Sequence, residues 1–252
     1  MRLKDKVAII TGAGLGMGRE ASVLFAREGA KVVAFDLDAQ AGQETVRLVE
    51  AAGGEANFVE GDASDEAAVK GAVDRAMEAY GAVHVLYANA GVLWKDRDKS
   101  VTETSVEDWD RVQAINLRGP FLLAKHGIGA LERSGGGSIL FVGSISALVG
   151  FTLAQDSYTA AKSALIGLAK SIAVQYGPKN IRCNVIHPGM IDTPLQAPYL
   201  DDESKRSIGD SLPLRRLGVA RDVANAALFF ASDESSWVTG AELLVDGGFI
   251  AT

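Results

Sequence analysis

Residues 6–18 read K-V-A-I-I-T-G-A-G-L-G-M-G, and this stretch decides the fold. The apolar run at 6–11 is short and rich in Val and Ile, which is typical of a strand buried on both faces of a parallel sheet. The glycine-rich turn that follows opens into an amphipathic segment at 16–28. A strand, a glycine turn and a helix in this order predict the first unit of a sheet wound with right-handed crossovers.

The alternation of strand and helix continues through the whole chain. Further runs that we expect to be strands lie at residues 31–36, 56–60, 84–88, 138–143, 182–187 and 242–245. Segments that we expect to be helices lie at residues 16–28, 38–52, 65–80, 105–131, 157–176 and 221–231. Repeated β-α-β units predict the α/β class, with a Rossmann-like, doubly wound fold whose parallel seven-stranded sheet is flanked by helices on both faces. No Pro- or Ser-rich linker divides the chain, so we expect a single domain over residues 1–252.

Residues 189–213 break this rhythm. They hold three prolines and an acidic tip, and we expect no strand in them. A long insertion before a helix is often a lid over a binding site, so we expect a substrate loop here. A solvated connection is the alternative that the sequence leaves open.

Composition and charge argue against several classes of protein. The chain of 252 residues is 48% apolar and 23% charged, which is ordinary for a soluble protein. A net charge of −7 argues against a general nucleic-acid binder, because such proteins present basic surfaces. No apolar run approaches roughly 18 residues, so we expect no membrane span. The lone Cys183 excludes an intrachain disulfide and, with an N-terminal apolar run too short for a signal peptide, favours a cytoplasmic location.

The turn at residues 11–18, T-G-A-G-L-G-M-G, indicates a dinucleotide site. Glycines let backbone N–H groups approach a pyrophosphate closely, and the N-terminus of the following helix favours its negative charge. Asp36 ends the second predicted strand, where a carboxylate accepts hydrogen bonds from the ribose hydroxyls of NAD and repels the 2′-phosphate of NADP. Neither Leu15 nor Leu37 offers a cation to that phosphate. The sequence therefore predicts NAD as the cofactor.

Tyr158 and Lys162, in Y-T-A-A-K, lie one turn apart on one face of a predicted helix. A phenol with a pKa of about 10 is a poor base at neutral pH, and an ammonium group beside it stabilises the phenolate and lowers that pKa. A Tyr that exchanges a proton is the general acid–base that interconversion of a carbonyl and an alcohol needs. The same spacing also arises by chance on exposed helices, so its interpretation depends on the rest of the chain.

Further motifs follow in a fixed order. They are T-G-x-x-x-G-x-G at 11–18, N-A-G at 89–91, Asn116 in the next long helix, G-S-I-S at 143–146, Y-x-x-x-K at 158–162, P-G at 188–189 followed by Ile191 and Thr193, and V-T-G with V-D-G-G at 238–240 and 245–248. In this ordered set, which runs over essentially its full length, the chain resembles the short-chain dehydrogenase/reductase family. The resemblance implies an NAD(P)-dependent oxidoreductase that acts on CH–OH groups.

The resemblance implies roles for four catalytic residues. Tyr158 would be the acid–base, and Lys162 would lower its pKa and hold the nicotinamide ribose hydroxyls. Ser144 would hydrogen-bond the substrate oxygen as charge develops on it. Asn116 would anchor a water in the proton relay; the alternative is a helix-breaking polar residue that satisfies backbone groups.

The resemblance also implies the residues that hold the cofactor. The phosphate turn would be lined, mostly through backbone atoms, by Gly12, Gly14, Leu15, Gly16 and Met17. Asp62 and Ala63 would flank the adenine, and Ile191 and Thr193 would hold the carboxamide. The other members of the expected NAD site are Asp36, Asn89, Tyr158, Lys162, Pro188 and Gly189.

The position of the serine departs from the family pattern. Many members place a Ser about thirteen residues before the Tyr, and that position here is Ile145, which cannot donate a hydrogen bond. The family often has a Gly six residues after the active Ser, and Gly150 stands in that relation to Ser144. We therefore favour Ser144, with Ser146 as the alternative, and the extra residue then falls in the loop at 151–157.

The substrate is predicted only as a class. The side chains expected to line its pocket are Trp94, Ser146, Leu153, Met190, Leu195 and Tyr199. Because these are mainly apolar, with aromatic area suited to a ring, we expect an apolar or cyclic secondary alcohol or ketone. Gln155 and Asp156 keep a sugar or polyol dehydrogenase open. A 3-oxoacyl-type reductase is a further alternative, against which Asp36 counts because that activity usually goes with NADPH.

No metal site is predicted, because His84, His126 and His187 are scattered without ligand spacing. We expect each to be a packing or surface residue, although His187 lies near the expected nicotinamide edge. A non-catalytic NAD-binding sensor is a remote alternative, since it would not need the four catalytic residues. The resemblance implies a homotetramer, and apolar faces on the predicted helices at 105–131 and 157–176 agree with a partner subunit.

Overall fold

The computed structural model of the protein describes residues 1–252, and a parallel sheet lies at its centre. The seven strands of this sheet are β1 (Val7–Thr11), β2 (Lys31–Asp36), β3 (Glu55–Glu60), β4 (Val85–Ala88), β5 (Gly137–Val142), β6 (Ile181–Pro188) and β9 (Glu242–Val245). Their order is β3-β2-β1-β4-β5-β6-β9, and every neighbouring pair is parallel. The predicted Rossmann-like, doubly wound fold is confirmed.

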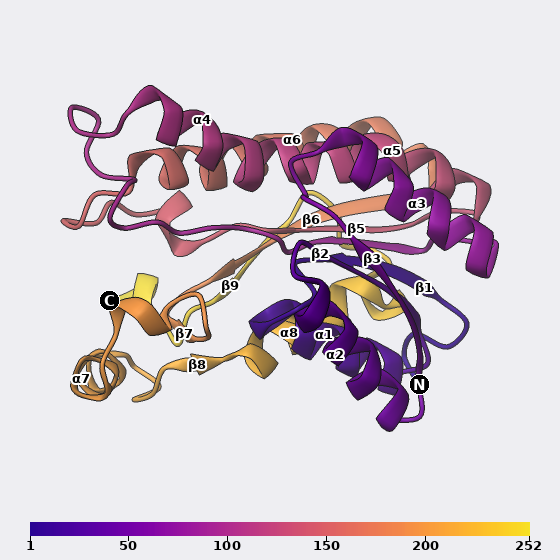
Figure 1. Cartoon of the computed structure of the whole chain (residues 1–252), viewed down its shortest axis with the longest axis horizontal. Helices are drawn as coiled ribbons and strands as arrows, with labels where there is room; N and C mark the ends of the chain where they lie inside the picture. Colours follow the sequence, from indigo (N-terminus) through magenta and orange to yellow (C-terminus); the bar gives the residue numbers. More distant parts are fainter.

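Helices cover both faces of the sheet (Figure 1). One face carries α1 (Gly16–Arg27), α2 (Ala39–Ala51) and α8 (Ala220–Ala231). The other face carries α3 (Glu66–Tyr80), α4 (Val106–Gln113), α5 (Gly119–Arg133) and α6 (Asp156–Tyr176). Within each layer the helices contact one another, α1 with α2 and α8, α3 with α5, and α4 with α6.

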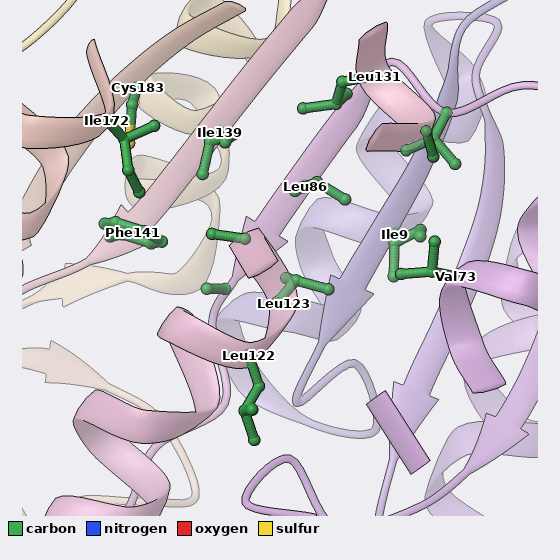
Figure 2. Packing of buried hydrophobic residues seen from close by; sticks show 14 of the residues in the cluster. Ile9, Val73, Leu86, Leu122, Leu123, Leu131, Ile139, Phe141, Ile172 and Cys183 are labelled. Atoms are coloured by element: carbon green, nitrogen blue, oxygen red, sulfur yellow. The ribbon is translucent and has the colours of Figure 1, made fainter. Parts of the chain in front are cut away.

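The sheet divides the hydrophobic core into two clusters, and β1 shows how. Val7 and Ile9 point into the cluster under α3, α5 and α6, whereas Ala8 and Ile10 point into the cluster over α1 and α8. Because successive side chains of a strand face opposite ways, a strand covered on both sides must be apolar at every position. Figure 2 shows the first cluster, in which Ile9 and other strand residues meet side chains of the helices.

The single helix expected at residues 105–131 is interrupted. A π-helical turn at Ala114–Arg118 separates α4 from α5. Pro120 has no N–H to donate to the carbonyl four residues earlier, and its ring crowds that carbonyl, so the regular ladder cannot run through Asn116. The wider turn is a frequent feature of functional sites, and here it carries Asn116 to the edge of the sheet where the site lies.

The insertion at 189–213 holds more regular structure than expected. Residues Ile191–Asp192 form β7, which pairs with β8 (Gly218–Val219) in a second, two-stranded sheet. A 3-10 helix at Ala197–Tyr199 and α7 (Asp202–Ser211) follow. The expectation of no strand is wrong, because a pairing of two residues is too short to leave an alternating pattern. Figure 1 shows these elements beside the chain's C-terminus, beyond one end of the central sheet.

The carboxyl ends of the central strands meet at one edge of the sheet. The strand order reverses between β1 and β4, and ligands of doubly wound proteins bind at such a reversal.

None of the helices combines the length and apolar character needed to cross a bilayer. No three His, Cys, Asp or Glu side chains are grouped so that they could hold a metal ion.

Candidate active site

The glycine turn lies between β1 and α1, at the point where the strand order reverses. Gly12 has a φ of +63°, a left-handed conformation that other residues rarely adopt. A Cβ atom at Gly18 would lie 2.0 Å from the carbonyl oxygen of Gly12, so the turn packs too closely for any side chain there. No side chain caps the N-terminus of α1, which leaves its first N–H groups available to an anion.

Asp36, the last residue of β2, is held against this turn. Its Oδ2 atom accepts a hydrogen bond from the Gly14 N–H at 2.7 Å, and its Oδ1 atom accepts one from the Asp38 N–H at 2.9 Å. The carboxylate therefore has a fixed position. It lines a cavity of about 330 Å³, the cofactor cavity, whose wall also includes Gly12, Leu15, Gly16, Met17, Asn89 and Thr193.

Asn89 joins the ends of β1 and β4 at the wall of the cofactor cavity. Its Nδ2 atom donates to the carbonyl oxygens of Thr11 and Gly12 at 3.1 and 3.0 Å. Its Oδ1 atom is buried and accepts no hydrogen bond from the protein. A buried acceptor without a partner fits a donor group of a ligand, since such atoms are normally hydrogen-bonded. The residues of this cavity thus fit a dinucleotide.

Asp62 and Ala63 do not line the cofactor cavity. The Oδ1 atom of Asp62 accepts hydrogen bonds from the N–H and hydroxyl of Ser64, and Oδ2 accepts one from Arg111 at 2.8 Å. Burial raises the pKa of Asp62, but these hydrogen bonds outweigh it and hold the pKa below its usual range. The carboxylate is thus engaged by protein groups, and a contact of Asp62 and Ala63 with adenine stays a prediction.

Tyr158 and Lys162 lie on the first two turns of α6, as their spacing predicts. Lys162 is buried and its Nζ atom donates to the carbonyl oxygen of Val142 at 2.8 Å, while lying 5.5 Å from the centre of the Tyr158 ring. Burial lowers the pKa of Lys162 to about 8. Burial raises the pKa of Tyr158, and the neighbouring Ser144 hydroxyl offsets only part of that rise. Burial and the Ser144 hydroxyl are the influences on the Tyr158 pKa here, so its expected lowering by Lys162 stays a prediction.

Both candidate serines line the same cavity as Tyr158, which we call the substrate cavity. The Ser144 hydroxyl donates to the Oγ atom of Ser146 at 3.3 Å and accepts a hydrogen bond from the Ser146 N–H at 3.1 Å. The Oγ atom of Ser146 also accepts a hydrogen bond from the Gln155 side chain at 2.7 Å. Each hydroxyl thus makes two hydrogen bonds within the protein, and the choice of Ser144 as the residue that meets the substrate stays a prediction.

His187, the second-last residue of β6, lies fully buried next to Ser144. Its Nδ1 atom lies 2.9 Å from the carbonyl oxygen of Ser144, and its Nε2 atom lies 3.3 Å from a carboxylate oxygen of Glu242. Burial lowers the pKa of His187 and so disfavours the charged form of the ring, although Ser144 and Glu242 oppose this effect. The ring packs in the interior, as expected of a packing residue, and it also fixes the backbone of Ser144.

Asn116 uses its whole side chain on the backbone. Its Oδ1 atom accepts from the Val92 N–H at 3.2 Å, and its Nδ2 atom donates to the carbonyl oxygens of Val92 and Val112 at 3.1 Å. A Cβ atom at Gly91 would lie 2.8 Å from this Oδ1 atom and 3.4 Å from Lys162 Nζ, so the two groups flank Gly91. These contacts are the ones that the backbone alternative describes, and the water-binding role stays a prediction.

Asp98 stabilises the start of α6, and the sequence analysis did not predict it. It is fully buried, and its two oxygens accept hydrogen bonds from the N–H groups of Ser157 and Tyr158 at 2.9 and 2.7 Å. No side chain at the N-cap of α6 makes this contact. A carboxylate at a helix N-terminus satisfies free N–H groups and is favoured by the helix dipole. No local signal could have revealed it, because 59 residues separate Asp98 from Ser157.

The substrate cavity has a volume of about 440 Å³. The predicted residues that line it are Ser146, Leu153, Met190, Leu195 and Tyr199, and from the expected cofactor site Met17, Pro188, Gly189, Ile191 and Thr193. Phe151 and Phe249, which were not predicted, also line it, and their rings stack 5.7 Å apart. This contact joins the loop after β5 to the C-terminal segment on the wall of the cavity.

Trp94 is wrongly predicted as a pocket residue. The Arg97 guanidinium lies 5.1 Å from the centre of its ring, and the ring does not line the substrate cavity. Its neighbours Leu93 and Lys95 line the cavity instead. Position along the chain locates this loop correctly, but it does not reveal which way each side chain of an irregular segment points.

Over residues 12–250 the chain matches the family model described as enoyl-(acyl carrier protein) reductase. The chain belongs to the short-chain dehydrogenase/reductase family. A cyclohexanol dehydrogenase of Acinetobacter sp. (strain SE19) is 37% identical, over 98% of this chain and 96% of that protein. A cyclopentanol dehydrogenase of Comamonas sp. (strain NCIMB 9872) is 39% identical, over 99% of each chain.

A solved structure agrees with this membership. The crystal structure of a protein of Burkholderia xenovorans, described as a short-chain dehydrogenase/reductase, matches with a TM-score of 0.92 at 37% identity, over 100% of this chain and 98% of that one. The protein is therefore an oxidoreductase that acts on CH–OH groups with NAD or NADP.

Replacing Asp98 tests whether its carboxylate stabilises the N-terminus of α6. We expect Asp98→Ala to lower the free energy of unfolding by about 1–3 kcal/mol, because two N–H groups of α6 lose their buried acceptor. We also expect turnover to fall, since Tyr158 is one of the two residues released. Denaturant unfolding and steady-state kinetics measure both, and Asp96→Ala, an exposed neighbour on the same loop, is the matched control. If Asp98→Ala had the same free energy of unfolding as the wild type, this role of Asp98 would be contradicted.

Replacing Lys162 tests its buried charge. The folded state lowers the pKa of Lys162 from 10.5 to about 8, so between these values the unfolded chain binds more protons and the contribution of this group to stability rises with pH. We expect Lys162→Met to be more stable than the wild type near pH 7, by about 1–3 kcal/mol after loss of the bond to Val142, and nearly inactive.

The gain in stability of Lys162→Met should shrink as the pH rises toward 10. Denaturant unfolding across this range measures the trend. Lys170→Met, which removes an exposed cation from the same helix, is the control and should show no such trend. A constant difference between Lys162→Met and the wild type at all pH values would show that the folded state does not lower the Lys162 pKa.

Proposed function

We propose that the protein is an NAD-dependent dehydrogenase that interconverts a secondary alcohol and a ketone, with Tyr158 as the acid–base. The observation that carries the proposal is that the substrate cavity and the cofactor cavity are neighbours and share lining residues. Tyr158 and Ser144 line the substrate cavity, Asp36 lines the cofactor cavity, and Met17 and Thr193 line both. A substrate beside Tyr158 would therefore adjoin a dinucleotide beside Asp36.

The preference for NAD rests on Asp36. Its two oxygens are fixed by the N–H groups of Gly14 and Asp38 and remain able to accept further hydrogen bonds. Ribose hydroxyls can donate to such a carboxylate, whereas a 2′-phosphate would be repelled by it. Leu37, the next residue, is 65% exposed and brings no compensating cation.

The chain's own residues supply the proton transfer. In oxidation Tyr158 takes the hydroxyl proton of the alcohol, and in reduction it returns a proton to the ketone oxygen. Ser144 donates a hydrogen bond to that oxygen and stabilises the charge that develops there. Lys162, whose pKa of about 8 allows it to exchange a proton near neutral pH, and Asn116 across Gly91 continue the path. When bound, the nicotinamide accepts or supplies the hydride.

An apolar or cyclic substrate is favoured by the walls of the substrate cavity, which carry Phe151, Phe249 and several aliphatic side chains. The names of two relatives, a cyclohexanol and a cyclopentanol dehydrogenase, support the same class. A sugar or polyol is less favoured, since Asp156 does not line the cavity and the Gln155 amide is engaged by Ser146. The homotetramer, the cytoplasmic location and the single-domain organisation stay predictions.

A change at Asp36 tests the choice of cofactor. We expect Asp36→Ala to lower kcat/KM for NAD by about 10- to 100-fold, the range of charge-assisted hydrogen bonds. The ratio of kcat/KM with NAD to kcat/KM with NADP should fall as a result. Initial rates with both cofactors on one alcohol measure the ratio. Glu60→Gln is the control. It removes a carboxylate from the residue of β3 that lies opposite Asp36 in the sheet register, and it should keep the NAD preference. Equal rates of the wild type with NAD and NADP would overturn the assignment.

The reaction itself is tested with cyclohexanol, cyclopentanol and glucitol in the presence of NAD, by following the absorbance of the reduced cofactor. We expect turnover of the cyclic alcohols, and a loss of about 10²- to 10⁴-fold in Tyr158→Phe, the range of general acid–base catalysis. Ser144→Ala should lose more activity than Ser146→Ala. Turnover of glucitol alone would overturn the apolar substrate class, and a larger loss in Ser146→Ala would exchange the roles of the two serines.

A further inference from the structure

Lys95 is the one charged side chain on the wall of the substrate cavity. Of the 24 residues that line this cavity, 14 are hydrophobic and none is Asp, Glu, Arg or His. An ammonium group in mainly apolar surroundings is unfavourable unless it is paired, because it loses hydration. Lys95 is only partly buried, and its ammonium group is the one positive charge that this cavity wall offers to a ligand.

Within the protein, only neutral groups compensate this charge. The Nζ atom of Lys95 donates to the side-chain oxygen of Gln196 at 3.3 Å and lies 4.9 Å from the centre of the Tyr199 ring. No carboxylate lies within 4.0 Å of it, although the other cation of the same short segment, Arg97, pairs with Asp108. Burial lowers the pKa of Lys95, because partial removal from water disfavours the charged ammonium group.

The location of Lys95 links it to the reacting groups. Gln196 and Tyr199 belong to the insertion that covers the cavity, and the Tyr199 hydroxyl donates to the carbonyl oxygen of Leu93 at 3.1 Å. Lys95 thus lies where the insertion meets the loop after β4. Ser144 and Tyr158 lie on the wall of the same cavity, so a molecule held by Lys95 shares its space with the reacting carbon.

We propose that Lys95 binds an anionic group of the substrate. The substrate class is then a secondary alcohol or ketone with an apolar body and an oxyanion, such as a carboxylate, away from the reacting carbon. An anion in this cavity would meet one cation and no competing carboxylate. This inference rests on the proposed function and narrows its apolar or cyclic class.

A purely structural role would have a different signature. If Lys95 only stabilised the position of the insertion through Gln196 and Tyr199, its replacement would change the affinity for charged and uncharged substrates by the same factor. If Lys95 recognises an anion, its replacement changes the ratio between a carboxylate and the matching carboxamide, which has nearly the same shape without the charge. The ratio therefore separates recognition from fastening.

Binding without turnover gives the first test. Calorimetry in the presence of NAD compares cyclohexanecarboxylate with cyclohexanecarboxamide, neither of which has a hydroxyl group to oxidise. We expect the carboxylate to bind roughly 10- to 100-fold more tightly, the range of charge-assisted hydrogen bonds. Lys95→Met should remove this preference and Lys95→Arg should restore most of it. Equal binding of the two ligands by the wild type would overturn the proposal.

Kinetics gives the second test. We expect a higher kcat/KM for 4-hydroxycyclohexanecarboxylate than for its carboxamide, by roughly 10- to 100-fold, with the difference in KM. The ratio should collapse in Lys95→Met and persist in Lys99→Met, which removes an exposed cation of the same loop that lies outside the cavity. A uniform loss on both substrates in Lys95→Met would assign Lys95 to fastening the insertion.

The two tests also distinguish a failure of the Lys95 proposal from a failure of the proposed dehydrogenase function. If no secondary alcohol is oxidised, cyclohexanol included, the proposed function fails, and the binding comparison still decides whether Lys95 recognises an anion. If cyclohexanol is oxidised and the carboxylate has no advantage in binding or in rate, the proposed function stands and the role of Lys95 is refuted.

Discussion

The parallel direction of the central strands is the constraint on which the rest of the structure depends. Because every strand runs the same way, the loops that follow β1, β2, β4, β5 and β6 all emerge at one edge of the sheet. These loops bring together groups that are far apart in sequence, from Gly12 to Thr193. Helices on both faces bury the strands, so the polar chemistry is confined to this edge.

The same edge holds polar groups that reduce stability. Lys162 is buried and Tyr158 loses much of its water, so each is held in an environment that disfavours its charged form. The carbonyl of Val142 compensates Lys162 only in part, whereas the buried Asp98 stabilises α6 by accepting hydrogen bonds from two of its N–H groups. A fold that retains such groups has placed function above stability at these positions.

The sequence predicted what depends on local pattern. The glycine turn, Asp36 at the end of β2 and the Tyr158–Lys162 spacing are carried by neighbouring residues, and they lie where expected. Asp98 and His187 were missed or only half understood, because their partners lie 59 and 43 residues away. The interruption at Asn116 and the position of the Trp94 ring away from the substrate cavity depend on backbone geometry that periodicity does not describe.

The shared wall between the two cavities has a thermodynamic consequence. Met17, Thr193 and Leu195 each face both spaces, so a dinucleotide that orders these side chains changes the surface that the second ligand meets. Affinities coupled in this way are reciprocal, and each ligand alters the dissociation constant of the other by the same factor. Cofactor and substrate on the two sides of this wall would therefore bind with coupled affinities, and Met17, Thr193 and Leu195 are the side chains through which that coupling would pass.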